Sequence, residues 1–207
     1  TQGYSSAASD GYKRQVGAHP GFPDLQGFGR RQMKLTPAEA KACVQYQIGA
    51  LKAFCDAAGV PLHHVKPHGA LYNMAGKDRA LADAICAAVK ESAPCAVLLA
   101  LSGSEMVKAA QAIGLPVANE VFADRGYRPD GSLVPRGTPG AMIEDEDEAI
   151  ARVIRMVTEG KVTANDGTDI AIQADSVCVH GDGPKALAFV EKIGAALQAA
   201  GVELKAF

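Results

Sequence analysis

A run of six apolar residues, Ala96–Leu101, limits the folds available to this chain more than any other feature. Pro94 bounds it on one side and Ser102-Gly103 on the other, so it is too short for a helix and reads as a strand. A strand without polar alternation is buried on both faces, as in parallel sheets that helices cover. The run therefore predicts an α/β protein.

Helices and strands alternate along most of the chain. Thr36, Pro37 and Glu39 form a capping box that starts a helix ending at Gly59. Further helices are predicted over 78–90, over 149–156 and from Pro184 to about Ala200, and another runs from a cap at Ser102 or Ser104 to Gly114. Further strands are predicted over 117–122, 169–174, 176–179 and 202–206. No hairpin signal and no internal repeat is expected, which favours parallel βα units in either an open doubly wound sheet or a barrel.

Polar clusters after the predicted strands favour the barrel. They are His19/Asp24, Lys66/His68/Asn73, Asp124/Arg125 and His180/Asp182. A barrel brings all strand carboxyl ends to one mouth, whereas an open sheet gathers only those near its switch point. We therefore expect a single irregular or incomplete (β/α) barrel domain over 1–207.

Composition narrows the function classes. The chain has 207 residues, 21 basic against 23 acidic, and no basic run, so nucleic acid is not expected as a partner. No membrane-spanning stretch and no signal peptide is found, which predicts a cytoplasmic protein. The five scattered cysteines are expected to be reduced core residues rather than zinc ligands.

The stretch His63–Asn73 is the strongest candidate for a site. It reads as a short strand followed by a turn, and strand alternation places Lys66 and His68 on one face. His63 and His64 are expected to face opposite ways. An inward lysine is costly unless it is paired or binds an anion.

Three other segments have alternative interpretations. Gly17–Asp24 is too rich in proline and glycine for a helix or a central strand, and is either a functional loop or a rigid turn. Ala123–Ala141 is long enough to be a lid, a binding loop or disordered. Glu144–Glu148 favours an acidic helix start, with an acidic metal cluster as the alternative.

Several motifs together resemble the LamB/YcsF family. They are Gly17-Ala18-His19-Pro20 with Phe22-Pro23-Asp24, His64–Asn73, Glu120–Tyr127, Ser132–Arg136 and Cys178–Asp182. The resemblance runs from about Gly17 to the C-terminus. It implies an irregular (β/α) TIM-like barrel of the polysaccharide-deacetylase type. The family's N-terminal acidic strand and its Cys-Gly-Phe-His-Ala-Gly-Asp segment are not found in the sequence, so about two N-terminal βα units of the barrel are expected to be absent, truncated or outside this numbering.

The resemblance also implies ATP-dependent opening of 5-oxoproline to L-glutamate, performed with B and C subunits of a 5-oxoprolinase. ATP, with Mg²⁺, is then a co-substrate, although the chain has no GxxxxGK[ST] motif. Whether copies of the chain associate into a homo-oligomer is left open.

The matched motifs supply the candidate site residues. The catalytic candidates are His19, Asp24, Lys66, His68, His180 and Asp182, and the substrate-binding candidates are Tyr72, Asn73, Arg125 and Arg136. A competing enzyme hypothesis is a metal-dependent amide hydrolase or deacetylase in which His19, His68 and His180 hold a divalent ion. A non-enzyme hypothesis is that the chain serves only to bind a small molecule or carbohydrate.

Overall fold

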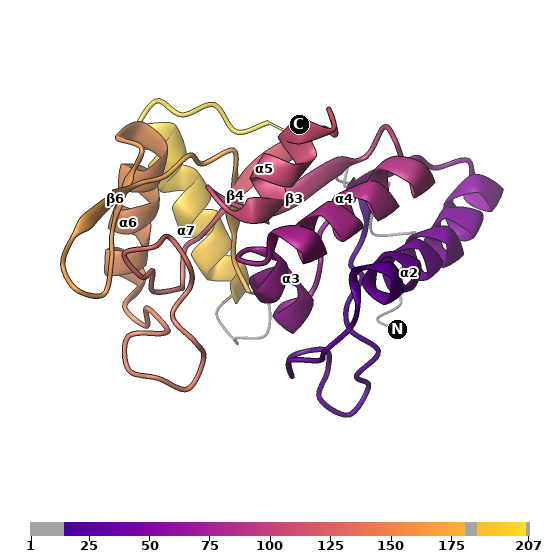
Figure 1. Cartoon of the computed structure of the whole chain (residues 1–207). Coiled ribbons are helices and arrows are strands. Elements are labelled where there is room, and N and C mark those ends of the chain that lie inside the picture. Colours follow the sequence, from indigo (N-terminus) through magenta and orange to yellow (C-terminus); the bar gives the residue numbers. More distant parts are fainter. Residues whose placement is uncertain (1–14, 181–185, 206–207) are drawn as a thin grey trace. The chain divides into compact units, whose positions relative to one another are not determined.

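The computed structural model describes residues 15–180 and 186–205 (Figure 1). The chain forms two compact units, one of residues 1–100 and 108–117 and the other of residues 101–107 and 118–207. Both combine parallel strands with helices, which confirms the α/β class. The units are described one at a time below, and the single-domain barrel stays a prediction.

Three parallel strands form the sheet of the first unit. β2 (Leu62–Val65) lies between β1 (Val16–Ala18) and β3 (Val97–Leu101). β1 differs from the prediction of a loop or turn over Gly17–Asp24, because Gly17 and Ala18 lie in a strand. The strand forms because Gly17 has no side chain: a Cβ there would lie 2.0 Å from Nε2 of His64.

The helices of the first unit follow local signals closely. α2 (Pro37–Ala58) has the predicted capping box between Thr36 and Glu39 and ends at Gly59, whose φ of 66° suits glycine. α4 (Arg79–Ser92) is capped by Asp78 and packs against α2. Figure 1 shows these two helices side by side. A short helix, α3 (Gly69–Ala75), was not predicted.

In the second unit β4 (Val117–Phe122) pairs in parallel with β7 (Ser176–Cys178). Two helices, α6 (Glu146–Thr158) and α7 (Ala186–Ala199), pack against each other. Their shared core includes Val153, Ile193 and Leu197. The acidic segment before α6 starts the helix as predicted, with the Asp145 side chain accepting the Glu148 amide.

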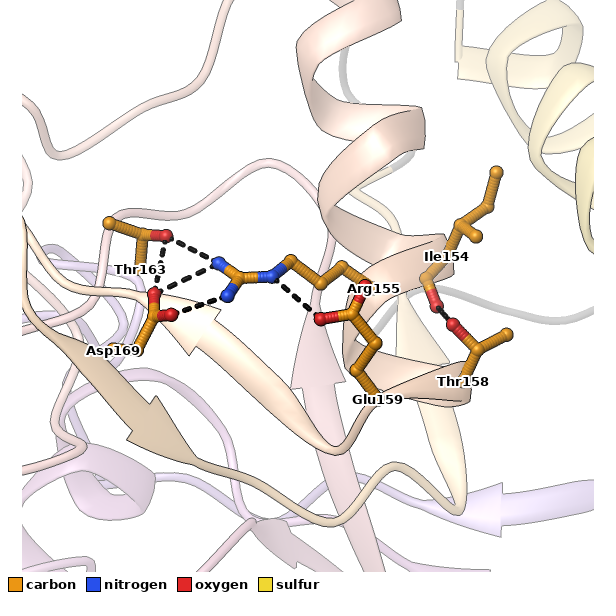
Figure 2. Close-up of polar contacts among 6 residues, drawn as sticks. All are labelled: Ile154, Arg155, Thr158, Glu159, Thr163 and Asp169. Atoms are coloured by element: carbon orange, nitrogen blue, oxygen red, sulfur yellow. Dashed lines mark hydrogen bonds and ion pairs between the residues drawn. The ribbon is translucent and has the colours of Figure 1, made fainter.

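An antiparallel hairpin in the second unit shows that the expectation of no hairpin was wrong. β5 (Lys161–Thr163) pairs with β6 (Asp169–Ala171), so the predicted strand over 169–174 is shorter than expected. Arg155 of α6 anchors the hairpin: its Nη1 donates to Thr163 Oγ1 at 2.8 Å and to Asp169 Oδ1 at 2.9 Å, as Figure 2 shows. The same guanidinium bonds Glu159 one turn along the helix.

Two smaller expectations were also wrong. In α5 (Glu105–Ala112) the start is not capped by the Ser104 hydroxyl, which is buried and has no hydrogen-bond partner among the described residues. Residues 202–205 are not a strand, and residue 206 lies outside the described part. No helix within 15–180 and 186–205 combines the length and the apolar character that crossing a bilayer requires.

Candidate functional site

Two predicted histidines meet in the first unit. His19 follows β1, and His68 immediately precedes α3. His19 Nε2 lies 2.9 Å from His68 Nδ1, and the two rings meet edge to face. Each outer nitrogen faces a backbone carbonyl: His19 Nδ1 is 2.7 Å from Lys66 O, and His68 Nε2 is 2.7 Å from Phe28 O. The pair thus ties together three segments of the chain.

The carbonyl of Phe28 belongs to a turn, residues 24–31, which we call the Phe28 loop. Asp24 organises it, since its buried carboxylate accepts the Gly27 amide at 2.9 Å and bonds the guanidinium of Arg31. Arg31 lowers the pKa of Asp24 to about 2, mainly through this hydrogen bond. Asp24, predicted as catalytic, therefore has its described bonds within the loop.

The backbone of the Phe28 loop has the strained conformation that its contacts demand. Phe28 is a non-glycine residue with a positive φ, 54°, and Gly29 has a φ of 66°. This turns the Gly29 carbonyl toward the amide of Ala70, 2.9 Å away. A Cβ on Gly69 would lie 2.6 Å from that carbonyl, so the close approach requires glycine.

The other predicted residues of the first unit lie beside the pair in the chain. The ammonium of Lys66, directly after β2, lies 6.0 Å from the centre of the Tyr72 ring, which is buried in α3. Asn73 is exposed, and its amide donates to Gly69 O at 3.1 Å. Lys66 and Tyr72 are thus near one another, whereas the described bond of Asn73 is internal to the helix.

The electrostatics of the first unit disfavour a charged His19. Desolvation of its ring, with further repulsion from His68 and Lys66, lowers the pKa of His19 to about 4. The pKa of His64 is lowered as well, first by burial and then by His63 and Lys66. His63 and His64 do not point apart as expected, since their Nδ1 atoms lie 3.3 Å apart.

The second unit holds a different histidine cluster. Asp124 follows β4 and His180 follows β7, and Asp124 Oδ2 lies 2.7 Å from His180 Nδ1. Arg136 Nη2 lies 3.0 Å from His180 Nε2. A guanidinium can only donate, so Nε2 accepts and the hydrogen sits on Nδ1, where the carboxylate accepts it. His180 is therefore neutral with a defined tautomer.

The surroundings hold this cluster in place. The ring of His180 stacks on Phe122, with centroids 6.0 Å apart. Asp124 Oδ1 is buried and has no hydrogen-bond partner among the described residues.

The arginines of the loop 123–141 have different surroundings. Arg125 is buried, donating from Nε to Ala141 O at 3.0 Å and from Nη2 to Val134 O at 2.6 Å. Burial lowers the pKa of Arg125. These bonds order the loop, which is neither disordered nor detached. Arg136 is exposed, and its role in binding a substrate stays a prediction.

The metal hypothesis stays a prediction. Within residues 15–180 and 186–205, no three His, Cys, Asp or Glu side chains group as ligands for one ion. All four nitrogens of His19 and His68 face other protein atoms. Asp182, the last catalytic candidate, lies outside the described residues.

Sequence reasoning missed the partners that make the histidines informative. Asp124 was noted only as part of a strand-end cluster, yet it holds His180; its position directly after a buried strand was the available signal. The sequence did not indicate that Arg31 pairs with Asp24 or that the Phe28 carbonyl bonds His68. The glycines at 27 and 29 were the only sign of a turn there.

Comparison with known proteins gives concordant results. Residues 5–207 match the LamB/YcsF family. A Clostridium beijerinckii protein, named as the A subunit of 5-oxoprolinase, is 64% identical over 189 residues, which cover 91% of this chain and 74% of the relative. The Alkaliphilus metalliredigens protein of the same name is 60% identical, over 87% of this chain and 71% of the relative.

A solved structure agrees with these relatives. The crystal structure of a lactam utilization protein from Thermus thermophilus is 50% identical, with a TM-score of 0.87. The match covers 97% of this chain and 80% of that chain. Together with the match over residues 5–207, this shows that the chain belongs to the LamB/YcsF family.

Proposed function

We propose that this chain is the A component of a 5-oxoprolinase and takes part, with B and C subunits, in the ATP-dependent hydrolytic opening of 5-oxoproline to L-glutamate. Relatives with this name at 60–64% identity support the assignment. The structural observation that carries it is the Asp124–His180–Arg136 cluster, because it combines a proton acceptor with a carboxylate-binding group.

His180 is suited to act as a general base. Its hydrogen lies on Nδ1 and faces the Asp124 carboxylate at 2.7 Å, so the lone pair of Nε2 can take a proton from water once Arg136 no longer bonds it. The imidazolium that results is stabilised by the same carboxylate. Asp124 thereby selects the tautomer and offsets the charge that develops.

Arg136 is suited to bind the carboxylate of 5-oxoproline. Its guanidinium covers His180 Nε2 at 3.0 Å, and Nη1 lies 3.5 Å from the Met142 sulfur, a weak acceptor. A substrate carboxylate offers a bidentate, charged partner, which is stronger than either contact. Substrate binding would then draw Arg136 away from Nε2 and free the base for catalysis.

ATP supplies the activation that a stabilised ring amide needs. Transfer of the γ-phosphoryl group to the ring carbonyl oxygen, with release of ADP, makes the ring carbon electrophilic. A first water adds to that carbon and gives its proton to His180, and the ring C–N bond breaks as the nitrogen takes a proton. A second water hydrolyses the resulting acyl phosphate to glutamate and phosphate. Mg²⁺ would accompany ATP, and a cytoplasmic location belongs to the same proposal.

Glutamate release tests the proposal directly. The chain would be incubated with 5-oxoproline, ATP and Mg²⁺, with and without the candidate B and C subunits. We expect glutamate and ADP in equal amounts only when all three proteins are present. Absence of glutamate from every combination of folded proteins would overturn the assignment, and binding of 5-oxoproline without turnover would favour a role in binding alone.

A further inference from the structure

A tyrosine hydroxyl ends the hydrogen bonding along one edge of β4 in the second unit. On this edge the Ser102 amide donates to Glu120 O at 3.0 Å, and in a regular parallel ladder the next bond would join the Phe122 amide to Ser102 O. The Phe122 amide donates to Tyr127 Oη instead, at 2.9 Å. β4 therefore leaves the regular ladder at Phe122, two residues before Asp124.

This bond closes a turn, residues 122–127, that contains Asp124. The turn is tightly packed, because a Cβ on Gly126 would lie 2.0 Å from Gly140 O. Tyr127 is fully buried, and its carbonyl accepts an amide from the turn of the β5–β6 hairpin at 2.8 Å. The hydroxyl is thus held from both sides and gives the end of β4 a fixed point.

The side chain of Phe122 extends this anchor to His180. Its buried ring stacks on the imidazole, with centroids 6.0 Å apart and planes inclined by 25°. Asp124 Oδ2 lies 2.7 Å from Nδ1 of the same imidazole. Phe122 contacts His180 through its ring and leads along the backbone to Asp124, so a shift of Phe122 changes the distance between the two.

We propose that Tyr127 is a positioning residue for the Asp124–His180 pair. Its hydroxyl holds the Phe122 amide, and this contact fixes where the carboxylate and the imidazole meet. The proposal rests on the role of His180 as the base in the proposed function. Without the hydroxyl the buried Phe122 amide loses its acceptor, and the acceptor that a regular ladder offers it is Ser102 O. Rotation toward that carbonyl would draw the carboxylate away from Nδ1 of the imidazole.

Tyr127 acts through the pair rather than on the substrate. Its side chain is fully buried, and burial raises the pKa of Tyr127, so the hydroxyl keeps its hydrogen near neutral pH. Its loss should therefore lower kcat, which depends on the base, and leave KM for 5-oxoproline, which depends on Arg136 in the proposed function.

Tyr127→Phe tests the proposal, since it removes the hydroxyl alone. The NMR signal of the His180 Nδ1 hydrogen, observed in the chain without partners or substrate, reports on its bond to Asp124. We expect this hydrogen to exchange with water about tenfold faster, or more, than in the native chain. With the partner subunits, kcat for glutamate release should fall about ten- to a hundredfold while KM stays within about twofold.

Three further variants separate positioning from a general loss of stability. Ile193→Val removes a buried methyl group from the core of the same unit, and Tyr46→Phe removes an exposed hydroxyl from α2. Both should keep the native exchange rate and kcat. Phe122→Leu keeps the backbone bond to Tyr127 but loses the stacked ring, so it should also speed exchange of the His180 hydrogen.

The native exchange rate in folded Tyr127→Phe or in Phe122→Leu would overturn the proposal. Equally fast exchange in Ile193→Val, or a rise in KM without a fall in kcat in Tyr127→Phe, would also overturn it. The exchange measurement needs no turnover, so it tests the positioning role even if no combination of subunits releases glutamate.

Discussion

The two histidine clusters place the same side chain between different partners. The His19–His68 pair ends in two carbonyl oxygens, which only accept hydrogen bonds. His180 lies between a carboxylate and a guanidinium, one acceptor and one donor, so it must be neutral. The partners at each end, rather than exposure, therefore decide what each histidine can do: the pair holds a loop, and His180 can accept a proton.

Asp124→Asn should have the largest effect, because it removes the carboxylate that accepts the hydrogen bond from His180 Nδ1. The amide removes the negative charge that stabilises the imidazolium, and it can also reverse the tautomer of His180. We expect kcat for glutamate release, measured with the partner subunits, to fall about 10³-fold. Asp166→Asn, in the exposed turn of the β5–β6 hairpin, is a matched control that should keep full activity. Equal losses in both variants would remove Asp124 from the mechanism.

Arg125→Met sharpens the contrast between the two arginines of the loop 123–141. It leaves the carbonyls of Ala141 and Val134 without their donor inside the protein. We expect the free energy of unfolding, measured in urea, to fall by about 2–4 kcal/mol. The exposed Arg136→Met should change it by less than about 0.5 kcal/mol, and a similar loss in both would contradict the structural role of Arg125.

Arg136→Gln tests whether Arg136, unlike Arg125, binds the carboxylate of 5-oxoproline. Loss of the charged, bidentate contact should raise KM for 5-oxoproline about tenfold, with a smaller change in kcat. Arg128→Gln, in the same loop, should leave KM unchanged. A fall in kcat alone would mean that Arg136 acts on the chemical step instead of on substrate binding.

Local signals in the sequence predicted much of the fold and little of the site's pairing. The capping box at Thr36 and Glu39 and the strand Val117–Phe122 depend on neighbouring residues, and the structure confirms both. The start of α3 was missed because His68 makes no side-chain cap and the Ala70 amide is bonded by Gly29 of a distant loop.

Neither the β5–β6 hairpin nor the partners of the site histidines could be predicted from the residues next to them in the sequence. The strands of the β5–β6 hairpin have three residues each, too few for clear alternation, and Arg155 of α6 stabilises them. The strand-end positions made His19, His68 and His180 candidates, and their roles stay predictions. Their partners could not be predicted, since Asp124 and His180 are 56 residues apart and His19 and His68 are 49 apart.

A substitution at Asp24 should give the smallest effect, and it tests the Phe28 loop, whose Phe28 carbonyl is bonded by His68. Arg31 keeps the pKa of Asp24 at about 2, below the ordinary 3.8, so the carboxylate stabilises the folded state above about pH 4. That contribution is lost as the pH falls from about 4 to about 2. The Tm of Asp24→Asn should therefore lie below that of the native chain at pH 5 and approach it near pH 2. A constant difference across this range would contradict the ion pair.

The histidine tautomers can be determined from one ¹⁵N spectrum of histidine-labelled protein, with assignments from single substitutions. The structure predicts that His180 carries its hydrogen on Nδ1, which faces Asp124, and not on Nε2, which faces Arg136. Observation of a hydrogen on Nε2 of His180 would contradict the account.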